Sequence, residues 1–470
     1  MLFNSLQFLV FFLVATLWFF RLKNQRHRVL LLLVASCYFY MSFVPVYIVI
    51  LGSVIIVDYF AGIQIEKSED KKRKRWLIVS LVANIGTLVV FKYYNFFLDN
   101  IHTGFLFFNK EIDLPFLRIA LPLGLSFHTF QAMSYTIEVF RKNQPAERNF
   151  VTYALYVMFY PQLVAGPIER PQNILPQLHE FRPYNRDNVK EGLARMLWGF
   201  YKKAVIADRL SIAVDYTYTY TGNCSSLALF TGAVLYAFQI YCDFSGYSDI
   251  AIGAAKVMNI KLMENFNQPF LSPNMNTYWK RWHISLSSWF YDYLYNPIVV
   301  SLRYWGKIAI TIGLLVTFFI SGLWHGAAWK FIVWGLLHGL ALVYEFHTRN
   351  IRRRIFNALP AWLSLYSSIL ITFTFGVFVF VFFRAKNINA AYTYIKEIFT
   401  FRSGSNYTGL NRGELLFSFV LIAIMIAREK FIPQHLIKKN SSFYLYMMVM
   451  VAICYFFGVF AENQFIYFQF

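Results

Sequence analysis

The sequence contains few charged residues of either sign, and this shortage argues against a soluble globular fold. Only 14% of its 470 residues are Asp, Glu, Lys or Arg, whereas an average soluble domain contains about 25%. Hydrophobic residues make up 58%, and apolar stretches of about 20 residues, the length of a bilayer span, recur without a long polar segment between them. The composition therefore predicts a single membrane-embedded domain over residues 1–470.

Sequence motifs for metal binding and for several common catalytic sites are absent. There is no nucleophile elbow, P-loop, HExxH motif or glycine-rich dinucleotide loop. The cysteines show no metal-ligand spacing, and a free thiol in an apolar stretch behaves as a small hydrophobe. These residues are Cys37, Cys224, Cys242 and Cys454. We therefore expect no metal site and no bound cofactor.

Acidic residues are scarce, with 24 against 44 basic residues and a net charge of +20. The cations lie in short clusters between apolar stretches, and no nucleic-acid-binding module accompanies them. Such clusters are typical of cytoplasmic loops that meet anionic lipid headgroups. The clusters are 21–28, 67–75, 141–148, 349–354 and 428–439. We expect membrane lipid as a partner, and no nucleic acid.

The apolar stretches predict an all-α, polytopic integral membrane protein. In lipid, each segment must satisfy its own backbone hydrogen bonds, so these stretches are predicted to be helices; β-barrel strands would be shorter and would alternate in polarity. The stretches fall at about 5–20, 29–45, 46–64, 76–97, 115–140, 196–216, 226–256, 307–328, 331–347, 361–384, 412–427 and 443–462. We expect about 11–12 transmembrane helices, with both termini outside, because this orientation places every basic cluster in the cytoplasm.

Two segments do not fit simple spans. Residues 150–175 are interrupted by Tyr160-Pro161 and Gly166-Pro167, and residues 257–300 mix aromatic residues with charge. Irregular backbone within a membrane persists only where protein or water surrounds it. We predict re-entrant or interfacial helices that line cavities. No internal repeat is present, which weakens a transporter interpretation based on repeat symmetry.

His325 is the first candidate catalytic residue. It lies between two apolar stretches in Gly322-Leu323-Trp324-His325-Gly326, where small residues let helices and ligands approach the backbone. An imidazole there can accept a proton from an acceptor hydroxyl, because its usual pKa lies near neutrality. The alternative is a histidine that donates to a carbonyl of a neighbouring helix.

Three further histidines lie in apolar or aromatic surroundings. His283 follows Lys280-Arg281-Trp282, a pattern that suits either a phosphate-bearing donor or an anchor at the membrane surface. For His338 and His128, helix packing is the expected role, and a place beside the site is the alternative.

Two carboxylates, Asp243 and Asp249, also lie in an apolar stretch. They stand six residues apart and so do not stack on one helix face. Pairing with Lys202, Lys203 or an arginine is expected, and a role in shaping the site is the alternative.

Five ordered motifs together resemble bacterial membrane-bound O-acyltransferases, in particular the alginate O-acetylation branch. They are residues 159–168, 243–249, 264–270, 279–287 and 322–326, and the segments 381–385 and 465–470 also fit. One departure is Lys280, where the branch often has arginine; this keeps the charge but loses bidentate phosphate binding.

The resemblance implies a helical core with an outward-facing funnel, a narrow tunnel and a cytoplasmic donor entrance. Residues 1–114 would form N-terminal helices, 115–347 the core that carries the motifs, and 348–470 C-terminal helices. The implied catalytic residues are His325 and, toward the donor side, His283. The implied donor-binding residues are Trp279, Lys280, Arg281 and Trp282, and the tunnel-lining residues are Asp243, Ser245, Trp324 and His338.

The resemblance further implies acyl transfer, most simply of acetyl, across the bacterial inner membrane. The donor would be a cytoplasmic thioester, either acetyl-CoA or an acyl carrier protein. The acceptor would be a hydroxyl of an extracytoplasmic polysaccharide or a periplasmic SGNH-type transferase. Two alternatives stay open: D-alanyl transfer toward teichoic acid, and a glycan transporter, although the few intramembrane charges argue against a wide polar path.

Overall fold

The computed structural model describes the chain except residues 2, 111, 118–121, 123, 432–439, 460–464 and 466–470. Residues 466–470 of the terminal motif and 432–439 of the last basic cluster therefore lie outside the described residues. Within the described part, regular structure is helical apart from one isolated bridge between Cys224 and Ser405.

The α-helices are α1 (Leu6–Arg21), α2 (Gln25–Met41), α3 (Tyr47–Lys67), α4 (Asp70–Leu88), α5 (Tyr94–Phe107), α6 (Leu125–Phe140), α7 (Phe150–Met158), α8 (Pro171–His179), α9 (Arg186–Phe200), α10 (Asp208–Thr219), α11 (Ser226–Val257), α12 (Met275–Trp279), α13 (Ile284–Phe290), α14 (Asn296–Ser301), α15 (Lys307–His325), α16 (Trp329–His347), α17 (Arg349–Asn357), α18 (Ala361–Arg384), α19 (Ile388–Phe399), α20 (Arg412–Phe431) and α21 (Asn440–Phe457). Short π-helical segments are Val89–Tyr93, Tyr201–Ala207 and Tyr291–Tyr295, and 3₁₀ turns are Thr221–Asn223, Pro269–Leu271 and Arg303–Trp305.

Six of the described helical segments are long and apolar enough to cross a membrane. They are Tyr47–Lys67, Asp70–Phe107, Ser226–Val257, Lys307–His325, Ala361–Arg384 and Asn440–Phe457. A seventh is added if α16 and α17, which are bent by 71° relative to each other, form one span. The all-α, multi-pass prediction is confirmed.

The number of these segments is smaller than the 11–12 spans expected from the sequence. α1 and α2 have only 16 and 17 residues. The stretch 196–216 is interrupted by the π-helical segment Tyr201–Ala207, which carries buried lysines. Apolar stretches in the sequence therefore overstate the number of full-length apolar helices, because some are short or carry internal ion pairs.

The chain divides into two compact units. The first contains residues 1–196 and 249–263, and the second contains residues 197–248 and 264–470. Along the chain, two of the boundaries fall within α9 and α11, and the third falls between residues 263 and 264, outside the helices. The single domain over 1–470, with its subdivisions 1–114, 115–347 and 348–470, stays a prediction.

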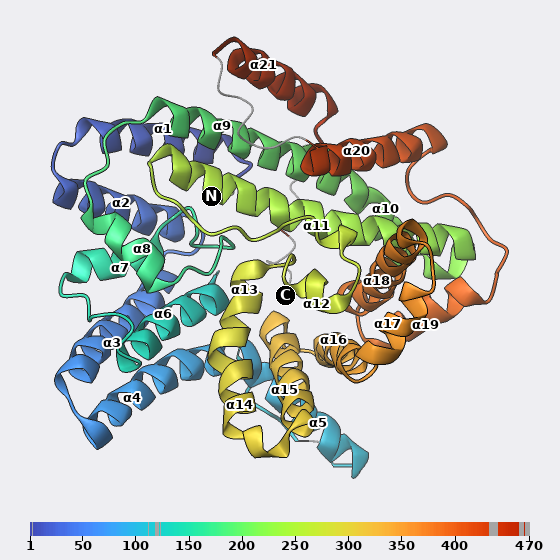
Figure 1. The fold of residues 1–470 in the computed structure, drawn as a ribbon, viewed down its shortest axis with the longest axis horizontal. Coiled ribbons are helices and arrows are strands. Elements are labelled where there is room, and N and C mark those ends of the chain that lie inside the picture. The colour runs from blue at the N-terminus through green and yellow to red at the C-terminus, as the bar shows by residue number, and fades with distance from the viewer. Residues whose placement is uncertain are drawn as a thin grey trace. The chain divides into compact units, whose positions relative to one another are not determined.

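In the first unit, α3, α4 and α6 pack against one another (Figure 1) around a buried polar cluster. Asp58 is fully buried and accepts hydrogen bonds from Ser80 Oγ at 2.6 Å and from Asn84 Nδ2 at 2.8 Å. The Thr136 hydroxyl lies 2.8 Å from that of Ser80. The cluster joins three helices and satisfies the carboxylate, as a buried polar group requires.

The first of the two irregular segments is also in this unit. Residues 159–169 are non-helical and buried, as expected for irregular backbone surrounded by protein. Two side chains stabilise the segment: Gln162 donates to the carbonyl of Tyr156 at 2.8 Å, and Glu169 accepts from the backbone N–H of Met263 at 2.5 Å.

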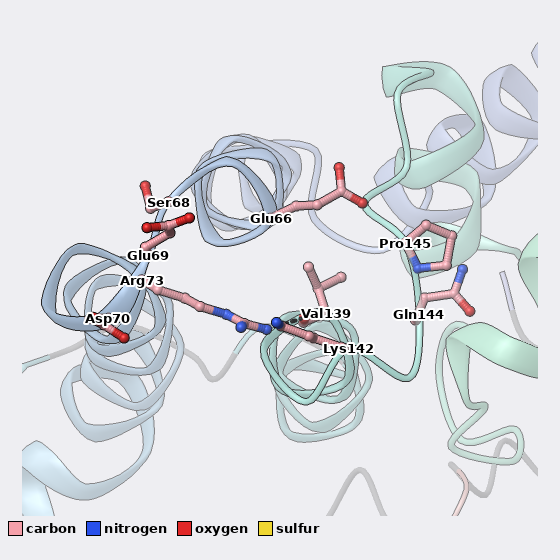
Figure 2. A pocket seen from close by; sticks show the side chains of 9 residues that line it. All are labelled: Glu66, Ser68, Glu69, Asp70, Arg73, Val139, Lys142, Gln144 and Pro145. Carbon is pink, nitrogen blue, oxygen red and sulfur yellow. Dashed lines mark hydrogen bonds between the residues drawn. The ribbon is translucent and has the colours of Figure 1, made fainter.

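A cavity of about 640 Å³ lies where the α3–α4 loop meets the end of α6. Figure 2 shows the side chain of Arg73 extending toward that of Lys142, with three carboxylates among the other lining residues. Its lining residues are Glu66, Ser68, Glu69, Asp70, Arg73, Val139, Lys142, Gln144 and Pro145. Most of them fall within the basic clusters 67–75 and 141–148, which were predicted to be cytoplasmic, and none is a candidate site residue.

In the second unit, α15 and α16 form a closely packed pair, and α16 also packs against α12 and α18 (Figure 1). Two glycines allow the close approach. A Cβ on Gly322 would lie 2.4 Å from the Phe331 carbonyl oxygen, and one on Gly335 would lie 2.2 Å from that of Phe318. Both distances are far below a van der Waals contact, so this helix pair requires glycine at these positions.

Candidate functional site

His325 is the last residue of α15 and is 5% exposed. The chain continues in extended form through Gly326 before α16 begins at Trp329. The imidazole therefore lies at the junction of two tightly packed helices, where the helical backbone is interrupted.

Three aromatic rings surround the His325 imidazole. Its ring centroid lies 4.9 Å from that of Trp324, 4.8 Å from that of Trp334 and 5.3 Å from that of Phe383. All three rings are nearly perpendicular to the imidazole, at 75° to 80°, which is a favoured geometry for aromatic pairs. The rings fix the orientation of the imidazole and exclude water from it.

His338 lies one turn after Trp334 on α16, and it contacts the predicted donor motif. Its ring centroid is 4.8 Å from Trp334 and 5.0 Å from Trp279. Trp334 therefore contacts both His325 and His338, and the indole of Trp279 joins the same group of rings. His338 is 1% exposed. His338 therefore packs between helices, as expected, and it also lies beside the site, which was the alternative.

His283 occupies a strained position at the start of α13. Its φ of 45° is left-handed, a conformation that costs a non-glycine residue about 1–2 kcal/mol. The ring is fully buried, 4.6 Å from Phe244 and 6.1 Å from Trp324. His283 and His325 therefore contact the same indole, and burial lowers the pKa of His283 to about 3.

Asn265 holds the His283 segment in this conformation. Its carbonyl accepts from Ile284 N–H at 2.9 Å, and its side-chain oxygen accepts from the Ser285 hydroxyl at 2.9 Å. Asn267 N–H also donates to the Arg281 carbonyl at 2.9 Å. The segments 264–270 and 279–287 are thus joined by hydrogen bonds.

Known proteins resemble the chain over most of its length. The model of the membrane-bound O-acyltransferase family matches residues 126–392. A probable alginate O-acetylase AlgI of Pseudomonas aeruginosa is 36% identical over 445 residues, which cover 91% of this chain and 82% of that protein. The chain belongs to the membrane-bound O-acyltransferase family.

The names of two other relatives state a different acceptor, or a different acyl group, from that of the alginate O-acetylase. A peptidoglycan O-acetyltransferase of Helicobacter pylori is 35% identical and covers 84% of this chain and 79% of its own length. A teichoic acid D-alanyltransferase of Bacillus subtilis is 28% identical over 56% of this chain and 69% of its own length. The protein is an O-acyltransferase and a multi-pass integral membrane protein.

The four predicted donor-binding residues of this membrane-bound O-acyltransferase separate into two pairs. Trp279 and Trp282 are buried, at 8% and 3% exposure. Lys280 is exposed, and Arg281 is half-buried and donates to the carbonyl of Leu271 at 3.4 Å. Trp279 therefore lies against His338 and Trp282 packs against other buried rings, whereas the cations lie nearer the surface.

Asp243, predicted to line the tunnel, is engaged in an ion pair with Lys203 at 2.6 Å. Lys203 also pairs with Asp208 at 2.8 Å, and Asp249 pairs with Arg195 at 2.9 Å. Both carboxylates thus have the cationic partners that the sequence led us to expect. Ser245 is buried, and its hydroxyl has no hydrogen-bond partner among the described residues.

Several residues that position the site were not singled out from the sequence. Lys330 donates to the carbonyl of Ala385 at 2.7 Å and to that of Phe383 at 3.3 Å, so it fixes the end of α18 that carries Phe383 against His325. Glu345 accepts from the N–H groups of Met275 and Asn276 and caps α12. The position of Lys330 shortly after Gly326 could have marked it in the sequence. Its hydrogen-bond partners, however, lie more than 50 residues further along the chain.

Proposed function

We propose that the protein transfers an acetyl group from a cytoplasmic thioester to an extracytoplasmic polysaccharide hydroxyl at the bacterial cytoplasmic membrane. Transfer would be direct or through a periplasmic SGNH-type transferase. The observation that carries the proposal is the buried His325 imidazole, which three rings surround; one of them, Trp334, also contacts Trp279 of the donor motif.

His325 is the general base of the proposed reaction. One of its ring nitrogens removes the proton from the acceptor hydroxyl as that oxygen attacks the thioester carbonyl carbon. The C–O bond forms, the C–S bond breaks, and the thiolate leaves and takes up a proton. The surrounding rings exclude water, which would otherwise hydrolyse the donor.

The two pairs in the 279–282 motif suggest how the donor binds. Lys280 and Arg281, nearer the surface, would hold the phosphates of acetyl-CoA or of the prosthetic group of an acyl carrier protein. Trp279, buried against His338, and Trp282, buried among other aromatic rings, would contact the apolar part of the thioester arm. His283, fully buried and held by Asn265, would keep this segment in place on the donor side.

Acetyl is proposed in preference to D-alanyl because of the extent of similarity. The relatives named as O-acetylases or O-acetyltransferases are 34–36% identical over 84–91% of the chain. Those named D-alanyltransferases are 28% identical over 47–56%. Membership of an acyltransferase family also removes the support for a glycan transporter.

Mass spectrometry of cell-surface glycan tests the proposal. Cells that express the wild type should carry O-acetyl groups, which cells with His325→Ala should lack at equal amounts of protein in the membrane. His347→Ala is the matched control, because this exposed histidine ends α16 and lies outside the ring cluster. Undiminished O-acetylation in His325→Ala would refute the mechanism, and D-alanyl esters in place of acetyl esters would refute the choice of acyl group.

A further inference from the structure

Three buried side chains beside His325 carry nitrogen atoms without a hydrogen-bond partner among the described residues. They are the indole Nε1 of Trp279, the indole Nε1 of Trp334 and both ring nitrogens of His338. Their side chains are at most 8% exposed. A buried N–H that lacks a partner costs about 1–3 kcal/mol, so three such residues in one place require an explanation.

The three residues form one contact group. The ring centroids of Trp334 and His338 lie 4.8 Å apart, those of Trp279 and His338 lie 5.0 Å apart, and those of Trp279 and Trp334 lie 5.9 Å apart. They come from two elements, α12 and α16, which pack against each other. We call Trp279, Trp334 and His338 the N–H group.

The N–H group touches the proposed general base. The Trp334 ring lies 4.8 Å from the ring of His325, nearly perpendicular to it. An acyl carbonyl that receives a nucleophile activated by His325 must lie within a few ångströms of that imidazole. Trp334 is therefore placed where the carbonyl oxygen of the donor would gain negative charge.

Indole and imidazole N–H groups suit this oxygen. An indole nitrogen can only donate a hydrogen bond, and a neutral imidazole donates from one nitrogen. In a site that excludes water, such neutral donors stabilise a developing oxyanion without a charge that would have to be buried. The group contains no carboxylate, which would repel that oxyanion.

We infer that the N–H group is the binding site for the thioester carbonyl and stabilises its oxyanion, with Trp334 as the principal donor. The inference rests on the proposed acyl transfer and adds the residues that recognise the acyl carbon. The four nitrogens are covered by neighbouring atoms in this structure. Entry of the acyl group therefore requires one of the rings to shift.

The test compares two analogues of acetyl-CoA on the full-length protein in detergent. One is a ketone in which a methylene replaces the sulfur, so the carbonyl remains; the other is the S-ethyl thioether, which lacks the carbonyl. The wild type should bind the ketone roughly three- to tenfold more tightly, the contribution of one neutral hydrogen bond. Trp334→Phe, which keeps a ring but removes the N–H, should bind both equally.

Turnover gives a second readout. Trp334→Phe should lower kcat by on the order of 10²-fold with little change in KM, because an oxyanion donor acts in the transition state. Trp334 replaced by benzothienylalanine, which preserves the indole shape without its N–H, should behave in the same way if Trp334→Phe misfolds. Trp198→Phe is the control for loss of a buried indole elsewhere, and it should retain activity.

The outcomes separate this inference from the proposed function. If the Trp334 variants keep both the ketone preference and the wild-type kcat, the inference is wrong while acyl transfer stands. If the wild type binds neither analogue and forms no acetyl product, the proposed donor is wrong. Loss of the ketone preference together with a normal KM supports the inference.

Discussion

Two buried polar groups in this protein are satisfied in opposite ways. In the first unit, the Asp58 carboxylate accepts hydrogen bonds from side chains of a neighbouring helix. In the second unit, His338 lies among aromatic rings, and neither of its nitrogens has a partner among the described residues. The bonds of Asp58 join helices, whereas the nitrogens of His338 keep the hydrogen-bonding capacity that we infer serves the substrate.

The largest effect is expected at His325. His325→Ala should lower the rate of acyl transfer in membrane vesicles by about 10²- to 10⁴-fold, the usual contribution of a general base. Thermal unfolding in detergent should change little, because the imidazole serves chemistry more than stability. If the rate for His325→Ala lies within tenfold of the wild-type rate, His325 is not the general base.

Asp58 should show the opposite pattern. Asp58→Leu would remove the acceptor that Ser80 and Asn84 share and leave them only the Thr136 hydroxyl and the Ser80 carbonyl, which should destabilise the protein by about 1–3 kcal/mol. The specific activity of the protein that remains folded should stay near wild type. Asp99→Leu, at an exposed position of α5, is the control, and equal unfolding temperatures for the two variants would contradict the prediction.

Lys330 lies between these extremes, because its hydrogen bonds hold the end of α18 that carries Phe383 against the His325 ring. Lys330→Met should lower kcat by about tenfold, since loosening Phe383 would misorient His325. Lys330→Arg should restore most of this loss by donating to the same carbonyls. Lys386→Met, which removes an exposed cation nearby, should have no effect on kcat, and a change in KM alone would contradict a positioning role.

The smallest effect concerns pH and His283. Its pKa is lowered from about 6.5 to about 3 by burial, so the unfolded state binds a proton between these values while the folded state does not. Stability should therefore decline as pH falls below about 6.5, by at most about 1.4 kcal/mol per pH unit. His283→Gln should reduce the slope of unfolding temperature against pH below about 6.5. An unchanged slope would show that groups other than His283 cause the pH dependence of stability.

The sequence predicted the fold class well and the number of apolar spans less well. The stretches at 46–64, 226–256, 307–328 and 361–384 became helices of full span length. The stretch at 196–216 did not, because a buried lysine pairs there with two aspartates around a π-helical segment. The charges of Lys202, Lys203, Asp208 and Arg209 mark this stretch in the sequence as the weakest span, but the second partner of Lys203, Asp243, lies far along the chain.

The sequence also identified His325 and His283 as candidates and predicted that Asp243 pairs with Lys202, Lys203 or an arginine. It did not show that the indoles of the 279–282 motif are buried while its cations are more exposed. The burial of adjacent residues depends on the direction in which the backbone places each side chain. Nor did the sequence reveal Asn265 and Lys330 as positioning residues, because both act through hydrogen bonds to segments far along the chain.

What the sequence determined by itself was local. Composition and the length of apolar stretches require a helical membrane protein, and the glycines around His325 and on the following helix permit a close helix pair. Only the tertiary structure decided which rings surround His325, that Trp334 contacts both it and His338, and that Trp279 joins them from α12. The reason is physical: helix formation depends on neighbours along the chain, whereas the surroundings of a catalytic group depend on side chains that packing brings together from separate helices.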